Sequence, residues 1–354
     1  MPKYCLEEYV QPFWQGNLMR YETVFFVGEE DEANLLYPPK KVLAVYDYGL
    51  QTEYVEGVDY ALCGGKIKRL KGGALPFMPT EEYYLPQFEK YEIRVNENAI
   101  PEGLTKPRFF AYGEADTFTK SQIAVVYEYD ERENLPAPTG KKERFPRFLE
   151  KCKKGEQTKI LFYGDSITTG CNSSGLPQGG VKPPYAEGFP DMVAKTLAKK
   201  LKTEVELINT AVGGWSVQNG LDAAEERVKA YEADVFVLAF GMNNGITPPA
   251  EFQAVTEQIV LAYREKNPFG EVVLVSTTLP NTDSNWVGYH PLFAETLYAL
   301  EKKYPFCSVA DMTAVHKTLL ERKRYRDMTG NDVNHPNDFL ARIYAQVILQ
   351  TILG

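Results

Sequence analysis

The apolar positions of the N-terminal third predict short β-strands. Runs rich in aromatic and β-branched residues fall at 21–27, 41–46, 91–95 and 122–129, and glycine and proline turns separate them. Short strands broken by turn signals at this spacing are typical of an antiparallel sandwich. We therefore expect an all-β, jelly-roll-like sandwich domain over residues 1–138.

The pattern changes after a proline-rich join, and strands then alternate with helices. Continuous apolar strands between helices predict a parallel sheet that is covered on both faces. We therefore expect an α/β catalytic domain over residues 139–354. Its expected strands cover 159–163, 205–209, 234–240, 271–277 and 307–311. Its expected helices cover about 145–154, 189–201, 217–232, 249–267, 291–303 and 338–353.

Composition and charge narrow the class of function. The 354 residues are 44% apolar and 25% charged, which is typical of a globular protein. A net charge of −9 argues against unspecific binding to nucleic acid, because such binding needs a basic surface. No apolar run is long enough to span a membrane, and the N-terminus lacks the pattern of a signal peptide. We expect a cytoplasmic protein with no membrane partner.

The cysteines favour neither disulfides nor a structural metal. They are odd in number, widely spread, and include no Cys-x-x-Cys pair, so buried free thiols are the simpler interpretation. The five are Cys5, Cys63, Cys152, Cys171 and Cys307.

Ser166 is the candidate nucleophile. It lies in the triplet Gly164-Asp165-Ser166, directly after the first strand of the expected parallel sheet. Binding sites in open α/β sheets form at the carboxyl ends of strands, so this serine is expected to face the crevice. The alternative is that Ser166 only caps the next helix. The segment is not the Gly-x-Ser-x-Gly elbow of the α/β-hydrolases, so that fold is not supported.

His335 is the candidate base. A serine hydroxyl is a weak nucleophile until a base accepts its proton. Asp332 lies three residues before His335, so its carboxylate is expected to orient the imidazole as the third member of a triad. The alternative for this pair is a helix-entry cap beside a surface histidine. His290 and His316 have no such partner in the sequence and are interpreted as structural.

Two further strand ends offer donors for an oxyanion. Gly214 follows the expected strand at 205–209, and its backbone N–H can approach a substrate oxygen closely. Asn243 follows the strand at 234–240 and carries a side-chain amide. The backbone N–H of Ser166 is the third expected donor. Taken singly, glycine pairs and asparagines after strands are more often ordinary turn formers.

Together, these segments give the chain a family resemblance. Residues 164–168, 209–214, 241–243 and 332–336 resemble the motifs of the SGNH (GDSL) hydrolase family, over roughly 159–354. The resemblance implies a flavodoxin-like, doubly wound parallel sheet and a Ser–His–Asp site with Ser, Gly and Asn as oxyanion donors. The domain order is also similar to that of two-domain carbohydrate esterases such as the family 2 acetylesterases. Some of those enzymes lack the aspartate, whereas this chain has Asp332.

The leading hypothesis is a serine esterase that removes small acyl groups, above all acetyl, from a carbohydrate through an acyl-enzyme. Trp215 and Trp286 are candidate substrate-binding residues, because flat aromatic faces can stack on sugar rings. The expected partner is a small-molecule or oligosaccharide ester. No cofactor or metal is expected. Two alternatives remain open: an acyl thioesterase or lysophospholipase, and a catalytically inactive carbohydrate-binding protein. The sequence does not predict the oligomeric state.

Overall fold

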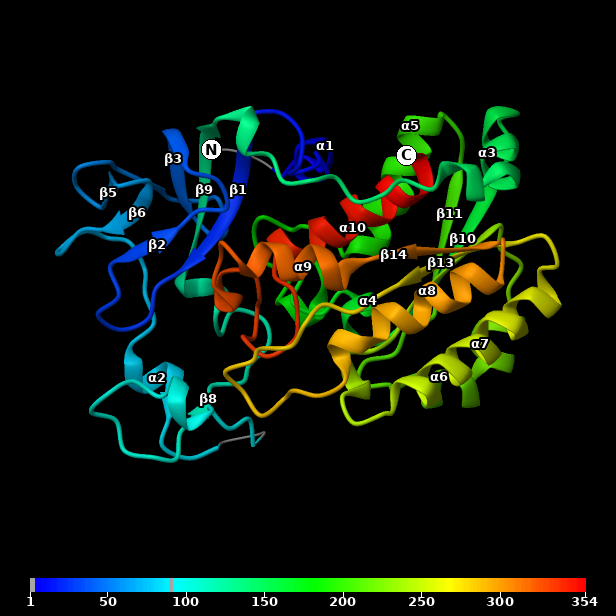
Figure 1. Cartoon of the computed structure of the whole chain (residues 1–354). Helices are drawn as coiled ribbons and strands as arrows, with labels where there is room; N and C mark the ends of the chain where they lie inside the picture. The colour runs from blue at the N-terminus through cyan, green and yellow to red at the C-terminus, as the bar shows by residue number, and fades with distance from the viewer. Residues whose placement is uncertain (1–3, 89–91) are drawn as a thin grey trace.

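The C-terminal part of the protein is built on a parallel sheet (Figure 1). A computed structural model describes residues 4–88 and 92–354. Neighbouring strands run parallel in the order β11-β10-β12-β13-β14. In chain order this is 2-1-3-4-5, the flavodoxin-like arrangement, so the predicted fold class is confirmed. The strands are β10 (Thr158–Gly164), β11 (Val205–Asn209), β12 (Val235–Ala239), β13 (Glu271–Val275) and β14 (Cys307–Ala310).

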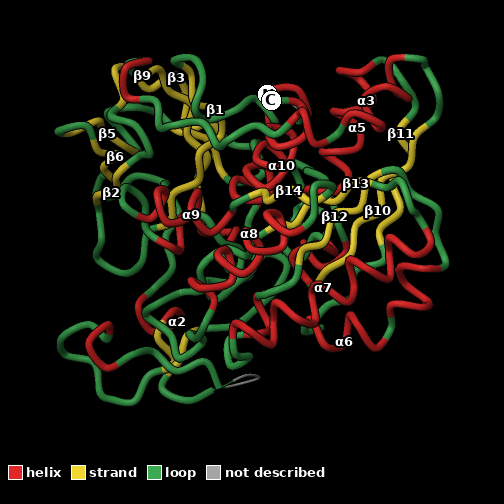
Figure 2. The backbone as a smooth tube through the Cα atoms, turned by 45° about the vertical axis from the view of Figure 1, so that its right-hand side comes forward, coloured by secondary structure: helices red, strands yellow, loops and turns green. Residues whose placement is uncertain are grey.

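Alternate residues of each strand serve two separate layers of core. Ile160 and Phe162 of β10 pack in the cluster that contains α5 and α10, whereas Leu161 and Tyr163 pack in the cluster that contains α7 and α8. Helices therefore cover both faces of the sheet (Figure 2). The helices of this part are α3 (Pro146–Lys153), α4 (Ser166–Thr169), α5 (Phe189–Leu201), α6 (Val217–Asp222), α7 (Pro249–Lys266), α8 (Phe293–Lys303), α9 (Met312–Leu320) and α10 (Asp338–Leu353).

Two helices differ from the prediction. The helix expected over 217–232 ends at Asp222, and a π-helical turn follows at Glu225–Lys229. Helix α9 was not predicted. It begins where the Asp311 side chain accepts a hydrogen bond from the N–H of Ala314, at 3.0 Å, which satisfies a free donor of the first turn.

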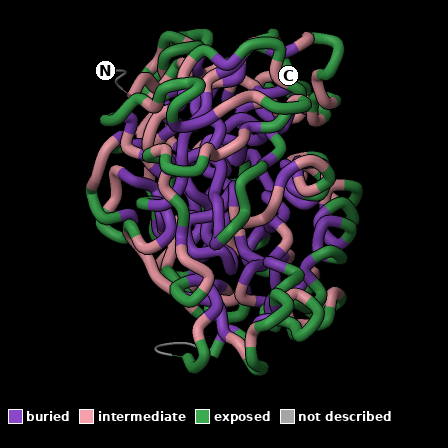
Figure 3. Tube along the Cα trace, turned by 90° about the vertical axis from the view of Figure 1, so that its left-hand side faces the viewer, coloured by how far each residue is buried: buried purple, intermediate pink, exposed green. Residues whose placement is uncertain are grey.

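Helix α10 lies in the middle of the molecule. All but two of its sixteen residues are buried, including Phe339, Ile343 and Val347. It packs against α5 and β14 and also reaches β1 of the N-terminal part. A helix that is apolar around most of its circumference must be covered on all sides, which explains this central place. Figure 3 shows the buried stretches gathered inside the molecule.

The N-terminal part is rich in antiparallel strands, as predicted. One sheet has the order β1-β9-β3-β4, a second has the order β2-β6-β5, and β7 pairs with β8. Tyr91 of the predicted strand 91–95 lies outside the described residues, and Arg94 and Val95 form isolated bridges only. The elements are α1 (Leu6–Tyr9), β1 (Leu18–Phe25), β2 (Glu32–Asn34), β3 (Pro39–Asp47), β4 (Glu53–Tyr54), β5 (Tyr60–Cys63), β6 (Lys66–Arg69), α2 (Thr80–Tyr83), β7 (Tyr84–Leu85), β8 (Phe109–Phe110) and β9 (Gln122–Tyr129).

The two parts share one hydrophobic core. Val24 of β1 and Ile343 of α10 belong to the same cluster of buried side chains. A fully buried ion pair also joins the parts, because Lys323 Nζ lies 2.6 Å from Glu22 Oε1. The division at residues 138 and 139 stays a prediction. Across residues 4–88 and 92–354, no helix is long and apolar enough to cross a lipid bilayer.

The burial of α10 predicts a large stability difference between two identical substitutions. Ile343 is fully buried, whereas Ile246 is 91% exposed. We expect Ile343→Ala to lower the free energy of unfolding by about 2–5 kcal/mol, because it leaves a cavity in the shared core. The matched control Ile246→Ala should change it by less than about 0.5 kcal/mol. Urea unfolding measures both, and equal effects would contradict the central place of α10.

Candidate active site

Ser166 lies at the point where the chain stops adding strands on one side of β10 and begins to add them on the other. Strand β10 is flanked by β11 on one side and β12 on the other, so the connections after β10 and β11 lead to opposite edges. Crevices form outside the carboxyl ends of strands at such a switch point. Ser166 begins α4 there, and the Asp165 side chain accepts a hydrogen bond from the N–H of Ile167 at 3.0 Å. Burial raises the pKa of Asp165 to about 6.

The structure brings His335 to Ser166. His335 Nε2 lies 2.8 Å from Ser166 Oγ, and both residues are buried. One side chain fixes the backbone of the loop that carries His335. Asn331 Oδ1 accepts hydrogen bonds from the N–H groups of Val333, Asn334 and His335 at 3.0–3.1 Å. This geometry lets the imidazole accept the serine proton.

The other ring nitrogen of His335 faces a carboxylate from the N-terminal part. His335 Nδ1 lies 3.0 Å from Glu114 Oε1 and 3.3 Å from Asn172 Oδ1. Glu114 belongs to the loop between β8 and β9. The three side chains therefore form a line from hydroxyl to imidazole to carboxylate, which is the arrangement of a Ser–His–acid triad.

Asp332 does not take the place predicted for it, and this part of the sequence interpretation is corrected. Its Oδ2 accepts a hydrogen bond from the Tyr83 hydroxyl, and its Oδ1 has no partner among the described residues. The backbone of Asp332 is left-handed, with φ of 56°. The chain therefore turns at Asp332 and points its carboxyl toward Tyr83, away from the imidazole. Burial raises the pKa of Asp332 to about 7.

The sequence carries no local signal for Glu114. It lies 52 positions before Ser166 (166 minus 114), in the part expected to be a separate sandwich, and no motif surrounds it. The turn around Asp332, by contrast, could have been suspected. Residues 330–334 are rich in glycine, asparagine and aspartate, and such residues favour tight turns and left-handed backbone.

Contacts from the catalytic part hold the Glu114 loop in place. The N–H of Ala115 donates to the carbonyl of Gln178 at 3.0 Å, and Lys182 Nζ donates to the carbonyl of Ala115 at 2.7 Å. Burial lowers the pKa of Lys182 to about 8. Both partners come from the glycine- and proline-rich segment that follows Ser166. This segment therefore fixes the distance between Glu114 and the imidazole.

The segment that carries Gly214, one of the expected oxyanion donors, passes beside the nucleophile. A Cβ added to Gly213 would lie 3.8 Å from the Cβ of Ser166, so this backbone passes directly beside the serine. Gly214 has φ of +79°, a conformation that favours glycine. Its N–H has no acceptor within the described part of the chain. Asn243 Nδ2 donates one hydrogen to the carbonyl of Trp215 at 3.0 Å, which leaves its second hydrogen for another acceptor.

The other two histidines are buried away from the triad. His290 Nε2 lies 2.9 Å from the carbonyl of Met242 and so supports the segment that carries Asn243. His316 Nδ1 accepts a hydrogen bond from the N–H of Leu279 at 3.1 Å, and burial lowers the pKa of His316 to about 3. Both positions agree with a structural role.

The candidate sugar platforms differ in exposure. Trp215 is partly buried against the core, and the guanidinium of Arg227 lies 5.7 Å from its ring centroid. Trp286 is 36% exposed, and its backbone N–H donates to Ser284 Oγ at 3.1 Å. Trp286 therefore offers the more accessible aromatic surface of the two.

A comparison with family profiles identifies the fold family. The profile of the GDSL-like lipase/acylhydrolase family matches residues 162–343, which is just over half of the chain. The chain belongs to the GDSL-like lipase/acylhydrolase family. The family resemblance that the sequence suggested is thereby confirmed. No curated protein sequence matches the chain.

Solved structures with similar folds include esterases of acetylated polysaccharides. A two-domain esterase active on acetylated mannans, crystallised with mannopentaose, is 24% identical with a TM-score of 0.48. The match covers 60% of this chain and 53% of that one, so the chain spans about half the length of this relative. An acetylxylan esterase from Geobacillus stearothermophilus is 17% identical with a TM-score of 0.46, over 56% of this chain and 94% of that one.

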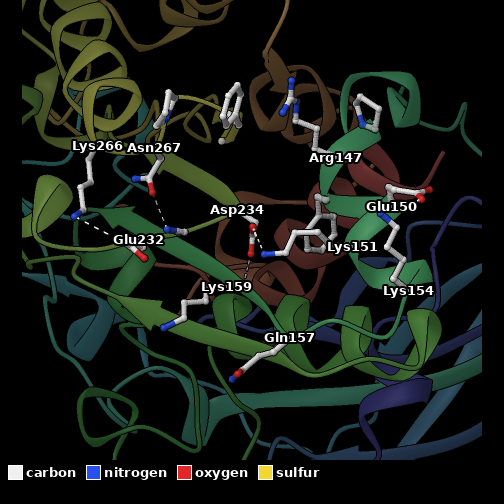
Figure 4. A pocket seen from close by; sticks show the side chains of 16 residues that line it. Arg147, Glu150, Lys151, Lys154, Gln157, Lys159, Glu232, Asp234, Lys266 and Asn267 are labelled. Atoms are coloured by element: carbon white, nitrogen blue, oxygen red, sulfur yellow. Dashed lines mark hydrogen bonds and ion pairs between the residues drawn. The ribbon is translucent and has the colours of Figure 1, made fainter.

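A separate cleft lies at the amino ends of the parallel strands, opposite the end where Ser166 lies. It has a volume of about 680 Å³ and lies where β10, β12 and β13 begin (Figure 4). Lys151 points to Asp234, at 2.7 Å, and Lys266 points to Glu232, at 3.5 Å. These cations are thus already paired with carboxylates. The cleft shares no lining residue with the Ser166–His335–Glu114 line.

The burial of Asp332 predicts a pH-dependent stability. Its pKa of about 7 lies above the usual value of about 3.9 in unfolded chains, so the folded state binds this proton more tightly. Its stabilising contribution is therefore fullest below about pH 4 and is lost as the pH rises toward 7. We expect Asp332→Asn, which cannot ionise, to gain stability relative to the wild type between pH 5 and pH 8. Urea unfolding at both pH values measures this gain, and a constant difference would contradict it.

Proposed function

We propose that the protein is a serine esterase that hydrolyses small acyl esters of carbohydrates. The observation that carries the proposal is the line from Ser166 Oγ through His335 to Glu114, with contacts of 2.8 Å and 3.0 Å. Membership of an acylhydrolase family supports the class of reaction. The line joins residues far apart in the sequence, and each member has the chemistry that its neighbour requires.

The geometry supports a two-step reaction. His335 Nε2 accepts the hydroxyl proton as Ser166 Oγ attacks the ester carbonyl, and the carbonyl carbon becomes tetrahedral with a negative oxygen. The backbone N–H groups of Ser166 and Gly214 and the amide of Asn243 are the proposed donors to this oxygen. The protonated His335 then gives its proton to the leaving alcohol, which leaves an acyl group on the serine. Water activated by His335 releases the acid and restores the enzyme.

Glu114 has the role that the sequence interpretation gave to Asp332. As an acceptor for the proton on His335 Nδ1, it keeps the Nε2 lone pair directed at the serine. Its negative charge also stabilises the imidazolium that forms in the transition state. The side-chain oxygen Oδ1 of Asn172, 3.3 Å from the same nitrogen, adds a second acceptor. The acid thus comes from the N-terminal part of the chain, whereas the nucleophile and the base come from the C-terminal part.

A short acyl group is the acid part of the ester that we propose. No long apolar stretch of the sequence suggests a lid or groove for a fatty acyl chain, which disfavours a lipase or lysophospholipase. An acetyl group needs no such surface, so acetyl is the acyl group that we propose.

The surface near Asn243 favours a carbohydrate as the alcohol part of the ester. The loop after β13 presents the partly exposed rings of Trp286 and Tyr289, with polar side chains beside them. The N–H of Tyr289 donates to the carbonyl of Gly245 at 2.8 Å, so this loop lies against the segment that carries Asn243. Aromatic faces with polar neighbours suit sugar rings, which have an apolar face and hydroxyl edges.

The proposed triad predicts different effects for two acidic residues. Glu114→Gln should lower kcat for 4-nitrophenyl acetate by about 10²–10⁴-fold, because it removes the charge that orients and stabilises His335. The matched control Asp332→Asn, equally neutral, should stay close to the wild type. Ser166→Ala should abolish turnover and so define the background rate. A larger loss in Asp332→Asn than in Glu114→Gln would contradict the assignment of the acid.

The proposed substrate predicts a preference in both halves of the ester. We expect kcat/KM for 4-nitrophenyl acetate to exceed that for the octanoate at least about tenfold. Acetate should be released from acetylated oligosaccharides, and Trp286→Ala should raise KM for these without changing KM for 4-nitrophenyl acetate. Phe269→Ala, an exposed aromatic in the distant cleft, is the matched control. A preference for octanoate, or equal effects of the two substitutions, would refute the substrate class.

A further inference from the structure

A thiol lies beside the acid end of the proposed triad. Cys171 Sγ, a ring nitrogen of His335 and a carboxylate oxygen of Glu114 all lie within 4.8 Å of one another, and the nitrogen nearest Glu114 is Nδ1 at 3.0 Å. Cys171 follows the nucleophile by five positions, and the proposed reaction gives it no role. Sulfur, imidazole nitrogen and carboxylate oxygen are the three kinds of ligand that zinc accepts in proteins.

The polar atoms of this cluster are incompletely satisfied. Glu114 Oε2 is buried and has no hydrogen-bond partner among the described residues. Cys171 Sγ lies 3.5 Å from Thr169 Oγ1. A buried oxygen without a partner calls for an explanation such as a bound water or ion. The Glu114 side chain is about one third exposed, so an ion can reach the cluster from solvent.

The distances are close to those of a tetrahedral site. Ligand bonds of about 2.0–2.3 Å place neighbouring ligand atoms of tetrahedral zinc about 3.3–3.6 Å apart. His335 Nδ1 and Glu114 Oε1 are already 3.0 Å apart. The sulfur lies within 4.8 Å of the other two atoms, so it must approach them by about 1.5 Å at most. Water can complete the fourth position.

We propose that Cys171, His335 and Glu114 form an inhibitory site for a divalent transition metal of the zinc type. This rests on the proposed function, because the metal acts on the base of that reaction. On binding, the thiol releases its proton to solvent, and the neutral imidazole moves its proton from Nδ1 to Nε2. The Nδ1 lone pair, the thiolate and the carboxylate then bind the metal. The two negative ligands balance its charge.

The bound metal inhibits by reversing the hydrogen bond to the nucleophile. With a proton on Nε2, His335 donates to Ser166 Oγ and can no longer accept the serine proton. The metal also engages Glu114, which then no longer stabilises an imidazolium. The nucleophile remains in place but loses its base. Magnesium should not inhibit in this way, because it prefers six oxygen ligands in octahedral geometry.

The test uses the full chain, freed of metal by dialysis against chelator that is then removed. Hydrolysis of 4-nitrophenyl acetate is measured against added ZnCl₂, with MgCl₂ as control. We expect Zn²⁺ to inhibit at least about tenfold at saturation, excess chelator to restore activity, and Mg²⁺ to have no effect. Absorption spectra with CoCl₂ report the site without any activity, since a thiolate ligand gives a sulfur-to-cobalt charge-transfer band in the near ultraviolet.

Variants separate this site from other thiols. Cys171→Ser should keep the basal activity, lose the cobalt band and weaken zinc inhibition at least about tenfold. The exposed-thiol control Cys63→Ser should change none of these. Glu114→Gln should keep the sulfur band but bind cobalt more weakly. An unchanged band or unchanged inhibition in Cys171→Ser would overturn the proposal. If the chain lacks esterase activity, the cobalt spectra still decide whether the metal site exists, so the two failures are distinguishable.

Discussion

The contact between His335 and Glu114 depends on how the two parts of the chain are held together. Glu114 comes from the N-terminal part and His335 from the loop before α10, so a small displacement between the parts would break the 3.0 Å contact. A shared core and the buried pair of Lys323 with Glu22 resist such a displacement. A buried ion pair adds little net stability, but a mispaired arrangement would leave a charge without a partner. Such a pair therefore fixes the relative position of the parts.

Asp332 also helps to hold the two parts of the chain in a fixed relative position. Its hydrogen bond from Tyr83 ties the His335 loop to α2, and Val333 packs in a cluster with N-terminal residues such as Phe118. The raised pKa of Asp332 is the energetic cost of burying a carboxyl with one unpartnered oxygen. Asp332 occupies the left-handed turn of the loop that carries His335, and its burial follows from that position. One acidic residue thus supports the loop, and another faces the imidazole.

The sequence predicted those features that have local signals. Apolar strands alternating with helices were enough to predict the parallel sheet. The positions of Ser166, Gly214 and Asn243 after successive strands predicted that they lie at the carboxyl ends of the sheet. The contact of His335 with Ser166 agreed with the expectation because motif order constrains both. Glu114 could not be found, since its role comes from long-range packing that no spacing encodes. Asp332 was misplaced because proximity in sequence was taken as proximity of side chains, while the left-handed turn points the carboxyl away.

The position of Glu114 changes what the N-terminal part contributes. A β-rich part ahead of a hydrolase could be a separate binding module, joined by a linker and free to move. Here Ala115 is bound to Gln178 and Lys182, on the segment that follows the nucleophile. Without the N-terminal part, the imidazole would lose its carboxylate, and the His335 loop would lose its tie to Tyr83. The N-terminal part is therefore a wall of the site and a source of one of its proposed catalytic groups.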